Sequence, residues 1–222
     1  MSIVEMQNQL PKYTRGEERF HMISHIVGGA VGVLALVFCV LSSALKGDVY
    51  GVVGSSVYGF TLILLYTVSS VYHGLTSVVG KWVMRVLDHC AIYLLISGTY
   101  TPILLTAIRR ESQVVCWSLM GLVWGLTALA VTLTAIDLKK YSVFSMICYI
   151  VMGWCIVLVP KVAFAAIAPT GLWLLLAGGI AYTIGAVIYG IGKKRRYMHG
   201  VFHVFVVAGS ILQLLCIYLY VL

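Results

Sequence analysis

Charged residues are scarce in this sequence. They make up 10% of its 222 residues, whereas hydrophobic residues make up 61%. A soluble domain carries roughly 25% charged residues and only about half apolar ones. This composition cannot supply the surface of a water-soluble protein, and it predicts a membrane protein.

The sequence also lacks cysteine pairs of the CxxC type and a secretory signal. Its six cysteines all fall inside or at the start of apolar runs, which favours small buried hydrophobes: Cys39, Cys90, Cys116, Cys148, Cys155 and Cys216. The first twenty residues are polar and have no cleavable signal pattern. We therefore expect residues 1–20 to form a polar cytoplasmic tail and residues 21–222 to form one transmembrane domain.

Seven apolar runs follow the tail, each long enough to cross a bilayer as a helix. They extend over residues 25–45, 50–75, 83–108, 116–136, 142–159, 172–191 and 200–222. The predicted fold is therefore an all-α membrane protein with a seven-transmembrane helix bundle.

Basic residues predict the orientation of the bundle, because Lys and Arg near span ends are retained in the cytoplasm. Eleven of the fifteen lie in the tail and the second, fourth and sixth loops, and four lie on the other side. We expect a cytoplasmic N-terminus and an outer C-terminus. The net charge of +8 follows this pattern, so nucleic acid is disfavoured as a partner, whereas residues 193–196 (KKRR) could contact anionic lipid.

Small residues mark two helix contacts. Gly28 with Gly32 and Gly121 with Gly125 have the spacing that lets helices approach closely in lipid. We expect both pairs to pack within the bundle rather than to form dimers. Pro102 is expected to kink the third span near its outer end.

Ionisable side chains inside spans are costly in free energy, and they mark functional sites. His73 ends the second span, four residues after Ser69; Asp88 and His89 begin the third span; and His199 and His203 begin the seventh. The alternating topology places His73, Asp88, His199 and His203 at one membrane level. Three imidazoles and a carboxylate are ligands suited to zinc, and three protein ligands leave the open position typical of catalytic zinc.

The same motifs resemble the hemolysin III family, whose relatives include the adiponectin and progestin receptors. The resemblance runs from about Glu17 to Leu222 and is carried by Glu17 and Glu18 with His25, by Ser69 to His73, by residues 87–102 (LDHCAIYLLISGTYTP), and by His199 to His203. It implies a bacterial-type, multi-pass protein of the cell membrane.

The resemblance further implies a zinc ion held by His73, His199 and His203, with Asp88 in contact through water. In relatives that are alkaline ceramidases, this residue set is proposed to hydrolyse lipid amides, with the position of Ser69 stabilising the oxyanion. His21 departs from the family, which commonly has Asn there, and the roles of His21, His25 and His89 stay open.

Three function classes follow from these observations. The first is zinc-dependent hydrolysis of a membrane lipid amide, with membrane lipids as the partners. The second is a non-enzymatic membrane regulator in which the His and Asp residues handle protons or ions. The third is a cytolysin, which is disfavoured because so apolar a chain should remain in its own membrane.

Overall fold

The computed structural model describes residues 2–192 and 195–222, and within these ranges the chain forms only helices and their connections. The α-helices are α1 (Ile3–Gln9), α2 (Arg15–Leu45), α3 (Val49–Gly74), α4 (Val78–Ile103), α5 (Arg109–Glu111), α6 (Gln113–Ile136), α7 (Ser142–Gly153), α8 (Pro160–Ala166), α9 (Pro169–Gly192) and α10 (Met198–Cys216). Three short helices of other types are η1 (Leu104–Ile108), η2 (Cys155–Leu158) and η3 (Ile217–Val221). The expectation of an all-α protein is confirmed.

Six helical segments among the described residues are long and apolar enough to cross a membrane: Arg15–Leu45, Val49–Gly74, Val78–Glu111, Gln113–Ile136, Pro169–Gly192 and Met198–Val221. The predicted fifth span, residues 142–159, is not one such helix. It is divided into α7, which has twelve residues, and the 3₁₀ segment η2, and α8 begins anew at Pro160. Proline favours the first turn of a helix, where its missing N–H breaks no hydrogen bond.

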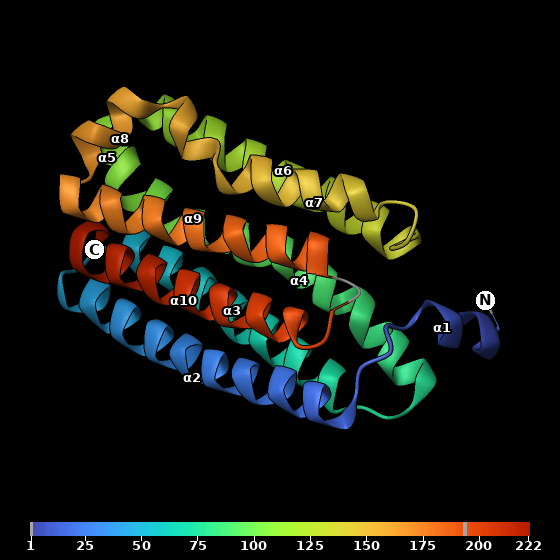
Figure 1. The fold of residues 1–222 in the computed structure, drawn as a ribbon. Helices are drawn as coiled ribbons and strands as arrows, with labels where there is room; N and C mark the ends of the chain where they lie inside the picture. Colours follow the sequence, from blue (N-terminus) through green and yellow to red (C-terminus); the bar gives the residue numbers. More distant parts are fainter. Residues whose placement is uncertain (1, 193–194) are drawn as a thin grey trace.

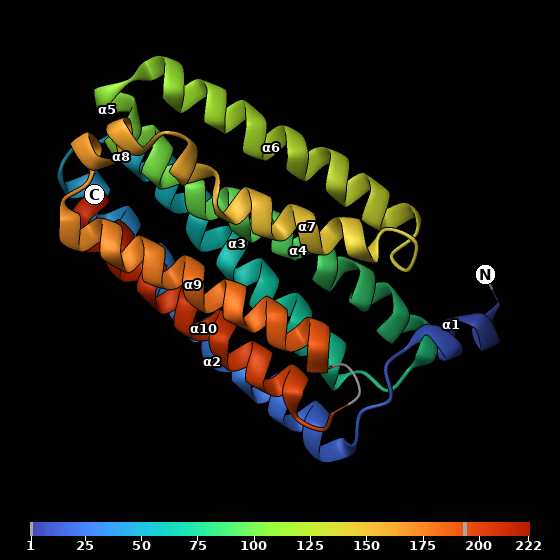
Figure 2. The same cartoon turned by 45° about the horizontal axis from the view of Figure 1, so that its top comes forward.

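The helices pack side by side in a bundle whose two chain ends lie at opposite ends (Figure 1). Helix α3 packs between α2 and α4, and α10 contacts both α2 and α9. Helices α6 and α7 lie together along the other side of α4, and the turned view separates them clearly from α2 and α10 (Figure 2). The segment from α7 to α8 runs along the bundle between the turn after α6 and the start of α9 (Figure 2).

Helix α4 forms the centre of the bundle, and it is the most buried of the spanning segments. Its outer end carries Pro102, after which the helix widens into the π-helical segment η1. The hydroxyl of Thr106 donates to the Pro102 carbonyl at 2.6 Å, one turn beyond the Gly98 carbonyl that the missing proline N–H leaves without its helical partner.

The two glycine pairs differ in how closely neighbouring helices pack against them. A side chain at Gly28 would meet the ring of Tyr66 at 2.3 Å, and one at Gly32 would meet the Ile63 backbone at 3.1 Å, so this pair packs α2 against α3 as predicted. No described atom lies within 4 Å of the position that a side chain would take at Gly121 or Gly125. For that pair the expected packing within the bundle is wrong, because α6 turns this face away from its neighbours.

The six cysteines are all free and buried. This confirms their expected role as small apolar residues.

Candidate functional site

Three histidines from two helices converge at one end of the bundle. The Nε2 atom of His199 lies 3.2 Å from Nε2 of His73 and 3.0 Å from Nε2 of His203. His73 is the last buried residue of α3, whereas His199 and His203 lie one turn apart in the first two turns of α10. The structure therefore brings together the three imidazoles that the sequence singled out.

The opposite ring nitrogens are held by acceptors. Nδ1 of His73 lies 2.6 Å from the Glu18 carboxylate, which also pairs with Lys81 at 2.5 Å. Nδ1 of His203 lies 3.3 Å from the backbone carbonyl of His21. Each Nδ1 therefore carries the proton, and the Nε2 lone pairs of His73 and His203 point into the cluster.

With both Nδ1 atoms protonated, too few protons remain for hydrogen bonds in both Nε2–Nε2 contacts. Nε2 of His199 can donate to only one of its two Nε2 neighbours, so at least one close contact would join two lone pairs. In a tetrahedral zinc site, with zinc to nitrogen distances of about 2.0–2.1 Å, the ligand nitrogens lie about 3.3 Å apart. The contacts of His199 with His73 and with His203 each have about this spacing, and imidazole nitrogens suit a metal ion such as zinc.

A fourth imidazole, His21, belongs to the same cluster. Single ligand atoms of His21, His73 and His199 all lie within 4.8 Å of one another, so among the described residues this trio, with His21 in place of His203, has the spacing of a metal site. His21 is fully buried, and neither of its ring nitrogens has a hydrogen-bond partner among the described residues. The sequence left its role open, and the structure places it at the centre of the site.

His25 completes a group of five histidines in ring contact. Its ring stacks on the His203 ring, with centroids 3.6 Å apart. It lies edge-to-face with the Tyr66 ring, with centroids 5.1 Å apart. Neither ring nitrogen of His25 has a hydrogen-bond partner in the part of the chain that the structure describes. His89, the sixth histidine of the chain, lies outside this group, and its Nδ1 is 2.9 Å from the Arg85 carbonyl.

Contacts between helix starts fix the cluster in place. Thr14 caps α2 and forms a reciprocal capping box with Glu17. The Glu17 carboxylate then accepts a hydrogen bond from the backbone N–H of Tyr197 at 2.9 Å, immediately before α10. A side chain at Gly200 would meet the ring of Phe20 at 2.5 Å, so only glycine allows α10 to approach α2 this closely.

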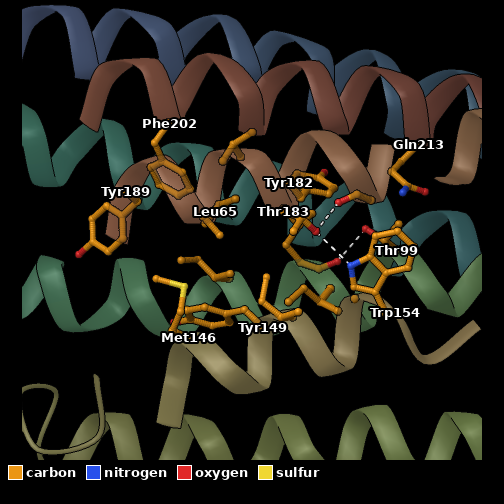
Figure 3. Close-up of a pocket in the computed structure, with 18 of the residues that line it drawn as sticks. Leu65, Thr99, Met146, Tyr149, Trp154, Tyr182, Thr183, Tyr189, Phe202 and Gln213 are labelled. Atoms are coloured by element: carbon orange, nitrogen blue, oxygen red, sulfur yellow. Dashed lines mark hydrogen bonds between the residues drawn. The ribbon is translucent and has the colours of Figure 1, made fainter. Parts of the chain in front are cut away.

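Ser69 and Asp88 lie beside the cluster, in the wall of an apolar cavity that also includes His25, His199 and His203. Ser69 is fully buried and its hydroxyl has no hydrogen-bond partner of good geometry, although the Asp88 carboxylate lies next to it. Asp88 is 8% exposed. The cavity has a volume of about 160 Å³ and continues between α4, α7, α9 and α10 (Figure 3).

A second, polar pocket of about 350 Å³ meets the cluster from outside. Both pockets share His89, Tyr189 and His199 in their walls. The segment after α1 covers this second pocket: Tyr13 stacks on His199 with centroids 5.3 Å apart, and Arg85 donates to the Gln9 carbonyl at 2.6 Å. Burial raises the pKa of Tyr13 far above its ordinary value, so the phenol stays neutral.

Sequence reasoning found His73, His199 and His203 but missed Glu18 as the partner of His73. Asp88 does not join the group of clustered nitrogens, and it faces the cavity beside them. Lys193 and Lys194 of the predicted lipid-binding cluster lie outside the described residues.

The chain is similar to known proteins over nearly its whole length. A model of the family described as haemolysin-III related matches residues 13–214. The chain is 32% identical to "Hemolysin-3" of Bacillus cereus, with 99% of this chain and 98% of the relative covered, and 33% identical to the "Hemolysin-3 homolog" of Bacillus subtilis (strain 168), with 94% and 96% covered. It is 25% identical to the human "Monocyte to macrophage differentiation factor", with 85% and 79% covered.

Proposed function

We propose that this chain, which belongs to the haemolysin-III related family of multi-pass cell-membrane proteins, hydrolyses an amide bond of a membrane lipid with the help of a zinc ion. The observation that carries the proposal is the position of the histidine cluster. It lies where an apolar cavity meets a polar pocket, and His199 lines both. A lipid amide matches these two pockets, because its acyl chain is apolar and its carbonyl and head group are polar.

In this proposal His73, His199 and His203 hold the metal through Nε2. Glu18 and the His21 carbonyl orient two of these rings and keep their Nε2 atoms unprotonated. A zinc ion held by these residues would supply Lewis-acid chemistry, namely polarisation of the amide carbonyl and activation of water. The remaining chemistry belongs to side chains in the cavity wall.

Asp88 and Ser69 are the candidates for that chemistry. We assign Asp88 the role of general base, because a carboxylate beside the metal ligands accepts a proton from the attacking water and can return it to the leaving amine. We assign Ser69 the stabilisation of the oxyanion, because its hydroxyl is buried and lines the cavity beside Asp88.

The proposal includes the topology predicted from the charges. Seven crossings with a cytoplasmic N-terminus would put the polar pocket at the cytoplasmic surface. Two observations support this reading: the chain ends lie at opposite ends of the bundle, and the segment from α7 to α8 runs along it like the six longer helices (Figure 1).

A hydrolysis assay tests the enzymatic proposal. The purified protein in lipid nanodiscs is incubated with a panel of N-acyl lipids, and release of fatty acid is followed by mass spectrometry. We expect Ser69→Ala to lower the rate about 10²- to 10³-fold, the usual effect of removing one oxyanion donor. Ser70→Ala is the matched control, because Ser70 donates to the Tyr66 carbonyl instead, and it should retain activity. Undiminished hydrolysis by a variant that has lost its zinc contradicts the proposal.

Proton handling is the second candidate, favoured by a different observation. The hydroxyls of Tyr66 and Tyr182 both bond to Ser210, at 2.7 and 2.8 Å, and Tyr66 contacts His25 of the cluster. Such a chain of imidazoles and hydroxyls inside a membrane is typical of a proton path. Proton flux in proteoliposomes, with no lipid product formed, would favour this candidate over hydrolysis.

A further inference from the structure

The end of the apolar cavity farthest from the histidine cluster is lined by polar side chains. The cavity extends along α10 from His199 and His203 to Gln213, which lies ten positions after His203. At 1.5 Å per residue this is about 15 Å along the helix. Figure 3 shows Tyr189 and Phe202 at one end of the pocket and Thr99, Trp154 and Gln213 at the other.

The cavity continues for roughly 15 Å along α10. Between its ends it is lined mainly by apolar side chains such as Leu65, Ile92 and Leu176. A long, apolar cavity suits an extended hydrocarbon chain.

The polar groups at the far end are nearly all paired. Trp154 Nε1 donates to the Thr183 hydroxyl at 3.0 Å, and Thr183 donates to the Gly179 carbonyl at 2.8 Å. Thr99 donates to the Leu95 carbonyl at 2.8 Å. These donors are engaged within the protein and leave little to bind a ligand.

Gln213 is the exception. Its Nε2 donates to the Leu175 carbonyl at 3.1 Å, which fixes the orientation of the amide. Its Oε1 is buried and has no hydrogen-bond partner in the described part of the chain, and the residue is only 6% exposed. An amide oxygen without a donor costs free energy inside a protein and more inside a membrane.

A hydrogen-bond donor on the ligand would satisfy this oxygen. The neighbouring donors of the protein are already engaged and cannot supply this hydrogen bond. A hydroxyl carried on an otherwise apolar chain needs only the one acceptor that Gln213 offers.

From these contacts we infer that the far end of the cavity is a subsite for a hydroxyl group, and that the ligand is an acyl chain of medium length with a hydroxyl near its end. The inference rests on the proposed function, since it places the carbonyl end of the acyl group at the histidine cluster. Gln213 Oε1 accepts the hydrogen bond from the ligand hydroxyl, about 15 Å from the cluster. Gln213 acts on ligand choice and takes no part in the chemical step.

Binding of free fatty acids tests the inference. The full-length protein in detergent is titrated by calorimetry with dodecanoic acid, with ω-hydroxydodecanoic acid, and with an isomer that carries the hydroxyl at mid-chain. We expect the ω-hydroxy acid to bind about tenfold more tightly than dodecanoic acid, as one added hydrogen bond predicts. The mid-chain isomer should bind more weakly than either, because its hydroxyl meets the apolar wall.

Two variants complete the test. Gln213→Leu should still bind dodecanoic acid, which shows that it is folded, but should lose the preference for the ω-hydroxy acid. Thr183→Val is the matched control, because the Thr183 hydroxyl is already paired, and it should keep the preference. Equal binding of the two acids by the wild type, or a preference that survives in Gln213→Leu, overturns the subsite while the acyl cavity stands. Failure of every acid to bind overturns the acyl cavity, and the subsite with it.

Discussion

At the scale of single residues, the sequence predicted three histidines of the cluster and left others without a role. His73, His199 and His203 were found because ionisable residues in spans are costly and because alternating topology brings them to one level. His21 and Glu18 were not assigned, since residues 15–20 read as a polar tail. A signal was present: the buried face of α2 runs through His21, His25, Gly28 and Gly32, and this spacing of three or four residues continues a helical face into the polar segment.

Replacing Glu18 tests its role as the residue that orients His73. Glu18→Gln removes the carboxylate that lies 2.6 Å from His73 Nδ1, so the affinity for zinc should fall about 10- to 100-fold, as is usual for partners of metal ligands. The affinity is measured by competition with a chromogenic chelator. Lys81→Met removes the ion pair with Glu18 but leaves the contact between Glu18 and His73 in place, so it should have a smaller effect; equal losses in the two variants would contradict the assigned role.

His21 decides whether the metal site is open. Hydrolysis requires a coordination position free for substrate or water, and a site closed by four protein ligands is structural. We therefore expect His21→Asn to keep about one zinc per chain, measured by mass spectrometry, and to keep its hydrolytic activity. Loss of zinc in His21→Asn would make the cluster a closed four-histidine site and would count against the enzymatic proposal.

At the scale of helices, apolar runs predicted the six long segments but did not predict that the fifth run is divided into shorter helices. Hydropathy measures only whether residues are apolar, and α7, η2 and their junction are equally apolar. The break between α7 and α8 depends on the local backbone from Gly153 to Pro160, which an apolar run does not reveal. Likewise, the spacing of Gly121 and Gly125 matches that of Gly28 and Gly32, but only tertiary packing determines which pair has a neighbour.

The two glycine pairs make opposite predictions for stability. Gly28→Leu would place a side chain where the Tyr66 ring lies, so overpacking should destabilise the bundle by about 1–3 kcal/mol. The Cβ added by Gly121→Leu meets no described atom within 4 Å apart from the nearby backbone of its own helix, so this variant should melt like the wild type. Thermal unfolding of both variants in the same detergent gives the comparison, and an unchanged melting temperature for Gly28→Leu would refute the packing of α2 on α3.

At the scale of the whole molecule, the bundle joins two pockets of different character at one histidine cluster. Composition and charge predicted a multi-pass membrane protein, and the family match supports this. The cavity itself could not be predicted, because it forms between side chains of α4, α7, α9 and α10 that lie far apart in the sequence. The same holds for the cover that Tyr13 forms over His199.

Topology is a prediction at this scale. Seven crossings require that the two chain ends lie on opposite sides of the membrane. Single cysteines introduced near each end of a variant that lacks the six native ones should differ in labelling by an impermeant maleimide on intact cells, with only the C-terminal one modified. Labelling at both ends or at neither would indicate six crossings.

The metal content of the purified protein tests the central claim most directly. We expect about one zinc per chain in the wild type, retention in His89→Ala, whose ring lies outside the cluster, and loss in His73→Ala and His203→Ala. Well-folded wild type without metal, or zinc that persists in both of the last two variants, would contradict a metal site built by these histidines.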